Sequence, residues 1–323
     1  MKTRQTILLI ACVFLLGLNV SMAAEPNYPT KPVELSVGVE PGGGIDLSAR
    51  MIAERIKPHL GQEMVVVNKP GAGGRVALTF LSKAKPDGYS LTSVGDPAIV
   101  LIPHLEKVMY DPIDDFTSVI QYGSFNIGYS VLADSPFQSI KDLIAFARAN
   151  PEKLTVCSMA VDSPGSIGFQ AMALHEGVKV KIVPFSGSGP AISAVLGGHV
   201  TVAGTSLSSQ MPHIKAKKFR LLAVMGDERD PAYPETPTLK ELGYPIVLES
   251  WYYIYGPKNM EKPVVKKLEE AFRKVIDSPE FTKFAQERLF WVKRPVAGED
   301  LRTALVRRHK EHGELLKKLG MIK

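Results

Sequence analysis

Cysteine is scarce in this 323-residue chain, which contains only Cys12 and Cys157. Cys12 falls within an N-terminal segment that we expect to be removed, so the remaining chain could form no internal disulfide. This excludes a small domain held together by disulfides, and it means that stability must come from a hydrophobic core. Cys157 lies in an apolar run, which predicts a buried strand residue rather than a nucleophile.

Long apolar runs are also missing. The run from Thr6 to Val20 is shorter than the ~20 residues that a helix needs to cross a bilayer, so a multispanning membrane protein is excluded. A hydrophobic fraction of 45% against 22% charged residues excludes a wholly disordered chain. The length is sufficient for about two globular domains with sizeable cores.

The first residues have the composition of an export signal. Lys2 and Arg4 precede the apolar run, and the small residues of Ser21–Ala23 follow it, as signal peptidase requires. We therefore predict a cleaved signal peptide over residues 1–24. The alternative is a lipoprotein, because Leu9–Cys12 has the residue types of a lipoprotein cleavage site, although few residues precede it and an apolar run follows.

Positive charge is in modest excess. The net charge is +6 and the isoelectric point is about 9.1. Removal of residues 1–24 takes away two basic residues and no acidic one, which leaves 37 basic against 33 acidic residues and a net charge of +4. The densest basic group, Lys215–Lys218, has no interleaved aromatic residues, so a nucleic-acid partner is not expected.

Short β-rich runs alternate with amphipathic stretches over most of the chain, an arrangement typical of β-α units on a largely parallel sheet and therefore of an α/β fold. Strands are expected at Val33–Val39, Met64–Val67, Ser90–Val94, Ile127–Leu132, Leu154–Val156, Val180–Pro184, Val200–Ala203 and Arg220–Met225. Helices are expected at Ile45–Ile56, Arg75–Ala84 and Ile140–Ala149, the last with a capping box formed by Ser139 and Asp142.

The C-terminal third is predicted to be helical. One helix has an apolar face from Val264 to Ile276, the next opens at Ser278–Glu280 with a cap and a proline, and the last spans Glu299–Leu319.

No internal repeat, low-complexity run or single linker divides the chain. Turn-rich stretches at 111–115 and 227–237 instead bracket a middle block, which indicates a chain that crosses from one domain to another and then returns. We predict a first domain over residues 25–125, a second domain over 126–228, and a return to the first domain over 229–323.

Glycine is concentrated in four loops, each of which follows an expected strand and precedes an expected helix. At a helix N-terminus, unpaired backbone N–H groups and partial positive charge favour an anion, and glycine lets a ligand approach the backbone. Such loops gather at the carboxyl ends of strands in α/β sheets, so four of them indicate a shared ligand site, although each could also serve only to reverse the chain. The loops are Pro41–Gly44 with Asp46, Pro70–Gly74, Ser163–Ser166 and Ser186–Gly189.

No motif of a nucleotide-binding or catalytic protein is complete. A P-loop is missing, and Leu47, Val76 and Ile192 stand where a dinucleotide fingerprint requires its third glycine. The nucleophile-elbow pattern is imperfect at Ser166 and Ser188, which leaves a secreted α/β serine hydrolase as an alternative.

Histidine gives no clear site either. His309 and His312 share one helical face among charged residues, which predicts a solvated surface rather than a metal pair. We predict no cofactor and no metal.

The chain also contains a series of short runs that occur in the same order in one known family. They are Tyr28–Val33, Gly42–Asp46 with Arg50, Val66–Gly74, Pro86–Tyr89, Asp134–Phe137, Pro164–Ser166, Pro184–Gly187, Leu196–Val200, Trp251 with Gly256–Pro257, and Lys318–Ile322. On these residues the chain resembles the periplasmic binding proteins of tripartite tricarboxylate transporters, the Bug or TctC-like family. The resemblance covers essentially the whole chain after the signal segment.

The resemblance implies a two-domain periplasmic binding fold of type II-like architecture, in which each domain is a mixed β-sheet flanked by helices. The cleft between the domains would close on a small organic carboxylate without catalysis. The protein would lie in the periplasm of a Gram-negative bacterium and deliver its ligand to two integral membrane subunits, one large and one small. We expect a monomer. A ligand sensor that docks on a membrane histidine kinase is a further alternative.

The family holds its ligand carboxylate mainly with loop amides, hydroxyls and ordered water. Carried over by position, the ligand-binding residues would be Gly42, Gly43, Gly44, Asp46, Gly95 and Asp96 on the first-domain side, and Ser163, Gly165, Ser166, Ser186, Gly187, Ser188, Gly189 and Thr205 on the second-domain side. The chain departs from the family at Ile45, where threonine is usual, and at Phe185–Ser186, where tyrosine and lysine are frequent. The second departure makes the expected pocket less polar, so the resemblance does not identify the ligand.

Overall fold

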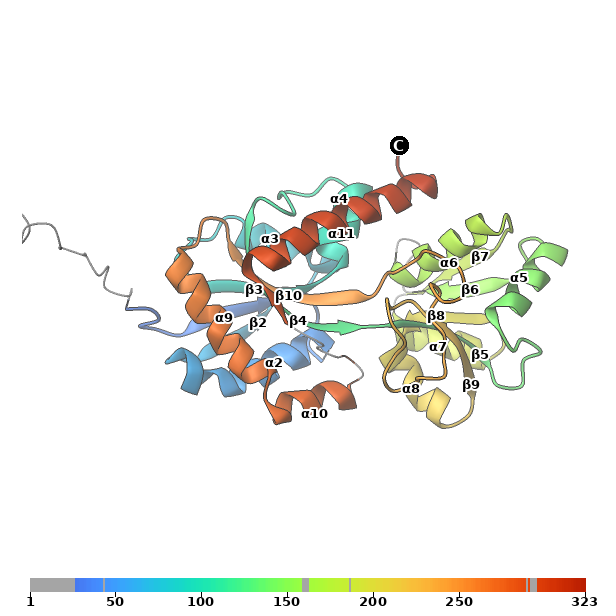
Figure 1. Ribbon diagram of the computed structural model, residues 1–323, viewed down its shortest axis with the longest axis horizontal. Helices are drawn as coiled ribbons and strands as arrows, with labels where there is room; N and C mark the ends of the chain where they lie inside the picture. The colour runs from blue at the N-terminus through green and yellow to red at the C-terminus, as the bar shows by residue number, and fades with distance from the viewer. Residues whose placement is uncertain (1–26, 43, 159–162, 186, 289, 291–294) are drawn as a thin grey trace, which may run out of the picture.

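The computed structural model describes residues 27–42, 44–158, 163–185, 187–288, 290 and 295–323. Over these residues the chain forms two β-sheets with helices packed against them, and the sheets lie side by side along the long axis of the molecule (Figure 1). The predicted α/β fold of two mixed sheets flanked by helices is confirmed. The predicted signal peptide and the lipoprotein alternative at Cys12 lie outside the described residues.

The first sheet combines strands from both ends of the described chain. Its strands are β1 (Val33–Val37), β2 (Met64–Asn68), β3 (Ser90–Gly95), β4 (Phe116–Phe125), β10 (Ser250–Pro257) and β11 (Val296–Ala297). Their order across the sheet is β11-β4-β10-β3-β1-β2. β1 is parallel to β2 and β3, whereas β10 is antiparallel to both of its neighbours, β3 and β4.

The second sheet is built from the middle of the chain. Its strands are β5 (Ile127–Leu132), β6 (Thr155–Ser158), β7 (Lys181–Pro184), β8 (Val202–Ser206) and β9 (Phe219–Val224), in the order β7-β6-β8-β5-β9. β6 is parallel to β7 and β8, and β5 is antiparallel to β8 and β9. Both sheets are therefore mixed rather than largely parallel, because strands next to the crossings run against their neighbours.

Helices cover both sheets. Those associated with the first sheet are α2 (Gly44–Leu60), α3 (Arg75–Leu81), the π-helix η2 (Pro97–Leu101), α4 (Ile102–Leu105), α9 (Lys262–Ile276), α10 (Pro279–Glu287) and α11 (Gly298–Lys318), with the short 3-10 turn η1 (Ala72–Gly74) before α3. Those of the second sheet are α5 (Ile140–Ala149), α6 (Pro164–His175), α7 (Ser188–Leu196) and α8 (Leu207–Lys215). α2 packs on α9, and α11 packs on β4 and η2.

β10 shows how a strand forms without polar alternation. Tyr252 and Ile254 belong to one hydrophobic core, and Tyr253 and Tyr255 belong to another. Successive side chains of a strand point to opposite faces, so a sheet that is covered on both faces buries them all. The sequence pattern indicated neither β10 nor β4 for this reason.

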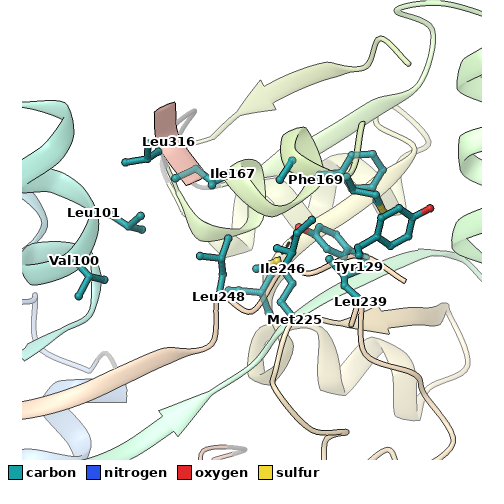
Figure 2. Close-up of a cluster of buried hydrophobic side chains, with 14 of the residues drawn as sticks. Val100, Leu101, Tyr129, Ile167, Phe169, Met225, Leu239, Ile246, Leu248 and Leu316 are labelled. Atoms are coloured by element: carbon teal, nitrogen blue, oxygen red, sulfur yellow. Dashed lines mark hydrogen bonds between the residues drawn. The ribbon is translucent and has the colours of Figure 1, made fainter. Parts of the chain in front are cut away.

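Apolar packing continues from the second sheet to the helices beside the first. Figure 2 shows Tyr129 of β5 and Ile167 and Phe169 of α6 in one buried cluster with Leu101 of η2 and Leu316 of α11. The C-terminal helix thus contributes to the packing between the two halves of the molecule.

The chain passes between the sheets twice. β4 ends at Phe125 and β5 begins at Ile127, so Asn126 alone separates the two strands. Asn126 is fully buried; its carbonyl accepts a hydrogen bond from the Leu207 amide at 2.9 Å, and its side-chain amide donates to Asp230 at 3.3 Å. The return passage leads from β9 to β10. A one-residue connection fixes where the two sheets meet.

Several predicted local features are confirmed. Ser139 and Asp142 form the predicted capping box of α5, and the Ser278 side chain accepts a hydrogen bond from the Phe281 amide at the start of α10. Cys157 is a fully buried residue of β6.

The prediction of a solvated surface for His309 and His312 is wrong. His312 is 5% exposed, and its Nδ1 lies 2.7 Å from the carbonyl oxygen of Arg308. The rings of His309 and His104 stack with their centroids 4.0 Å apart. This face of α11 packs against η2 and α4 instead of solvent, which the charged neighbours in the sequence did not reveal.

Candidate functional site

The carboxyl ends of the parallel strands in the first sheet lie at one edge. The pairing register places Gly95, at the end of β3, opposite Tyr252, and places Tyr252 opposite Gly123 near the end of β4. β1 and β2 run parallel to β3, so their carboxyl ends lie at this same edge. This is the edge from which β4 leaves for the second sheet.

The second sheet presents the equivalent edge to the same crossing. Ile127, the first residue of β5, pairs with Ser206, the last residue of β8. β8 and β7 are parallel to β6, and Ser158 pairs with Pro184 at the carboxyl ends of β6 and β7. Because one residue joins β4 to β5, the carboxyl edges of the two sheets meet at the crossing (Figure 1). Ligands of open α/β sheets bind at carboxyl edges of this kind.

The first predicted loop surrounds the N-terminus of α2. Asp46 is 1% exposed, and its carboxylate accepts hydrogen bonds from the Gly42 amide at 2.8 Å, from Asn68 Nδ2 at 2.8 Å and from Arg50 Nε at 3.1 Å. Burial raises the pKa of this carboxyl, but the three hydrogen bonds outweigh burial and hold the pKa below its usual range. Asp46 therefore holds the loop before α2 in place. The backbone of Gly42 and Gly44 in this loop lies at the carboxyl edge of the first sheet. Gly43 lies outside the described residues.

Gly95 and Asp96, which were predicted together as ligand-binding residues, take different positions in the structure. Gly95 lies at the carboxyl edge, whereas Asp96 is 2% exposed and accepts hydrogen bonds from the Tyr253 hydroxyl and from Arg308 of α11. Arg308 also donates to the Glu249 carbonyl at 2.9 Å, and its guanidinium lies 4.1 Å from the centre of a ring of Trp251. The Asp96 carboxylate is thus engaged in a buried ion pair that ties β3 to the C-terminal helix.

The third loop opens α6 at the edge of the second sheet. A Cβ on Gly165 would lie 2.1 Å from the Gly204 carbonyl oxygen, so only glycine permits this contact between α6 and β8. The Tyr129 hydroxyl donates to the Gly165 carbonyl at 2.8 Å. Ser166 is fully buried, and its Oγ accepts a hydrogen bond from Gln170 at 2.9 Å.

The remaining predicted residues lie on neighbouring elements of the same sheet. Ser163 is the N-cap residue of α6, Gly187 is the N-cap residue of α7, and Ser188 and Gly189 open that helix. No atom of the described residues lies within 4 Å of the position that a Cβ would take on Gly187 or Gly189. Thr205 of β8 is 1% exposed and accepts a hydrogen bond from Gln210. Ser186 lies outside the described residues.

One residue at the first edge was missed. Tyr252 follows Trp251 on β10, and its hydroxyl lies 2.7 Å from the position of a Cβ on Gly44, the first residue of α2. The period of two along β10 is the signal that could have identified it, because that period turns Tyr252 away from Trp251 and Tyr253.

Other kinds of site find no support in the described part of the chain. No group of three or more histidine, cysteine, aspartate or glutamate side chains there could hold a metal ion. No helix there is both long and apolar enough to cross a membrane.

Comparison with known proteins identifies a family and close structural neighbours. The model of the tripartite tricarboxylate transporter family receptor, TctC, matches residues 48–321. The UPF0065 protein in the gbd 5'region of Cupriavidus necator is 33% identical over 308 residues, which cover 94% of this chain and 92% of that protein. Protein BugT of Bordetella pertussis is 29% identical over 268 residues, 81% of each chain.

Two structural neighbours contain carboxylates. An R. palustris protein solved with adipate superposes with a TM-score of 0.78 at 28% identity and covers 91% of this chain and 99% of its own. MatC from Rhodopseudomonas palustris, solved with bound malate, has a TM-score of 0.75 at 25% identity and covers 90% of this chain and 100% of its own.

Proposed function

Because this chain belongs to the tripartite tricarboxylate transporter receptor family, we propose that it is a periplasmic binding protein that captures a small organic carboxylate between its two sheets. It releases this ligand to the integral membrane subunits of a transporter. The protein reaches the periplasm through its N-terminal signal peptide and carries out no catalysis.

The meeting of two carboxyl edges at a one-residue crossing is the observation that carries this proposal. Gly42, Gly44 and Gly95 lie at one edge, and Ser163 and Gly187 lie at helix starts of the other. A ligand that contacts both edges binds the closed arrangement more tightly than the open one and so shifts the population towards closure. The donors on offer are amides and hydroxyls, which suit a carboxylate.

The two acidic residues of the predicted site are paired within the protein and so do not oppose an anion. Asp46 is paired with Arg50, and Asp96 is paired with Arg308. Because each carboxylate is paired with an arginine, its charge is balanced within the protein. An anionic ligand at this edge then meets mainly neutral amide and hydroxyl donors. The hydrolase alternative gains no support at Ser166, which is fully buried and hydrogen-bonded to Gln170.

A thermal-shift screen of the purified chain tests the proposal. The probes are adipate, malate, citrate, benzoate and glutamate, each at saturating concentration. A ligand that binds only the folded state raises the melting temperature, by an amount that corresponds to about 2.7 kcal/mol at 100 times its Kd. We expect at least one carboxylate to stabilise the chain, and calorimetry then gives its stoichiometry as one. No shift with any of the five would contradict the proposal.

A further inference from the structure

Tyr252 combines deep burial with an unused hydroxyl. Its side chain is 8% exposed, and no hydrogen bond joins its hydroxyl to any described residue. The Tyr252 oxygen is not enclosed, in contrast to that of Tyr255, which is buried and has no hydrogen-bond partner among the described residues. A hydroxyl that can be reached from outside, on a side chain that is otherwise buried and fixed, can donate to a molecule that enters from solution, so this position suits an acceptor from outside the chain.

The Tyr252 hydroxyl points at the N-terminus of α2. It lies 2.7 Å from the position of a Cβ on Gly44, so glycine is what allows the approach. α2 has 17 residues, and the amides of its first turn have no partner within the helix. The hydroxyl and the unpaired amides therefore converge on one place at the carboxyl edge of the first sheet.

Three aromatic rings hold Tyr252 in this position. The centre of its ring lies 5.8 Å from that of Tyr122, 5.3 Å from that of Phe125 and 5.8 Å from that of Phe290. Burial raises the pKa of the Tyr252 phenol well above its usual value, so the group is a protonated donor at neutral pH. A donor that is already fixed loses little entropy when it binds.

We propose that the Tyr252 hydroxyl donates a hydrogen bond directly to the ligand carboxylate, which the N-terminal amides of α2 hold at the same time. This inference rests on the proposed function and adds to it a side chain that recognises the anionic oxygen. It also explains why α2 begins with glycine beside β10: any Cβ there would occupy the space of the hydroxyl.

The test compares two buried tyrosines, one whose hydroxyl has no hydrogen bond to a described residue and one whose hydroxyl is hydrogen-bonded inside the protein. Tyr252→Phe removes the hydroxyl that faces the α2 N-terminus. Tyr122→Phe is the matched control, because its fully buried hydroxyl is hydrogen-bonded inside the protein to Ser48 at 3.1 Å and to Ser93 at 2.8 Å. Circular dichroism and the melting temperature without ligand establish that each variant folds. Calorimetric titrations with adipate, malate, citrate, benzoate and glutamate then give the affinity of each variant.

We expect Tyr252→Phe to weaken binding of the carboxylate by about 10- to 100-fold, the effect of losing a hydrogen bond to a charged group. Tyr122→Phe should lower the melting temperature and leave the affinity within about threefold, because its hydroxyl serves only the interior. The inference is overturned if Tyr252→Phe binds as tightly as the wild type, or if both variants lose affinity equally. If the wild type binds none of the five probes, the proposed function fails first and this inference with it.

Discussion

The two edges that meet at the crossing are constructed by different means. At the first edge, buried carboxylates are fixed by arginines: Asp46 by Arg50 and Asp96 by Arg308. At the second edge, small residues allow backbone to touch backbone, as where Gly165 lies against Gly204. The first edge is held by charge and the second by the absence of a side chain.

This difference shows how the proposed anion site can remain neutral. Charge pairs position the first edge rigidly and leave no unbalanced charge on the two aspartates. Close packing positions the second edge without ionisable groups at Gly165. Both constructions present amides and hydroxyls at the crossing, and each should respond to its own kind of perturbation.

The largest expected effect comes from breaking the buried charge pair. Arg308→Met leaves the Asp96 carboxylate, which is 2% exposed, without its cation, and should lower the free energy of unfolding by about 3–5 kcal/mol. Urea denaturation measures the loss. Arg50→Met is the matched control: Asp46 is as buried as Asp96, but the Arg50 side chain is 44% exposed, and without it Asp46 keeps the hydrogen bonds from the Gly42 amide and Asn68, so the loss should be only about 1 kcal/mol. Equal effects of the two variants would show that burial does not distinguish the pairs.

The second edge should be destabilised by a steric clash when a side chain is added at Gly165. Gly165→Ala places a Cβ 2.1 Å from the Gly204 carbonyl oxygen and should destabilise the chain by about 2–3 kcal/mol as α6 is forced off β8. Gly189→Ala, in the first turn of α7, brings the new methyl group within 4 Å of no described residue and should be neutral or slightly stabilising. Urea denaturation of both variants checks the pair. A neutral Gly165→Ala would contradict the close-packing account.

Acid should lower the stability of the fold through His312, which lies near the buried Asp96–Arg308 pair. Burial, assisted by the charge of Arg308 and opposed by that of Asp96, lowers the pKa of His312 to about 4. The unfolded chain binds the proton first, at a pKa near 6.5, so stability is full above that pH and falls as the pH drops towards 4. His312 alone should cost about 2 kcal/mol at pH 5 relative to pH 7.

Urea denaturation at pH 7 and pH 5 measures this cost. The His312→Gln variant should lose less stability on acidification than the wild type, and a variant of the exposed His59, His59→Gln, should behave as the wild type does. If His312→Gln is as acid-sensitive as the wild type, another group is responsible.

The smallest expected effect concerns the loop before α2. Asp46→Asn removes the charge that three donors share and should lower stability by about 1–2 kcal/mol. Glu54→Gln, at an exposed ion pair with Arg55, should change stability by less than about 0.5 kcal/mol. A chemical-denaturation series can resolve the two. Identical curves would indicate that the Asp46 hydrogen bonds do not stabilise the loop.

Much of the fold could be predicted because its signals are local. The caps at Ser139 and Ser278 and the apolar face from Val264 to Ile276 depend on residues three or four positions apart, and each forms as the spacing indicates. β10 was not found because its burial on both faces depends on helices distant in the sequence. The solvated surface predicted for His309 and His312 was wrong for the same reason, since His309 contacts Ile99 of η2 and His104 of α4, which lie far from it in the sequence.

The candidate site could be predicted only as a set of loops. The glycine pattern pointed to Gly42, Gly44 and Gly165, and these residues lie at the carboxyl edges. Among the described residues, the space beside Gly42 is open, whereas Gly44 and Gly165 are in close contact with Tyr252 and Gly204. The sequence did not reveal that Asp96 pairs with Arg308, 212 positions away. Nor did it reveal that Tyr252 reaches Gly44, because that contact depends on the register between β10 and β3.

A crystal structure of the chain grown with the carboxylate that gives the largest thermal shift tests the central claim most directly. The account predicts one ligand at the crossing, with its carboxylate oxygens within hydrogen-bond distance of donors from both sheets. A ligand bound to one sheet only, or held by an arginine or lysine side chain instead of amides and hydroxyls, would contradict it.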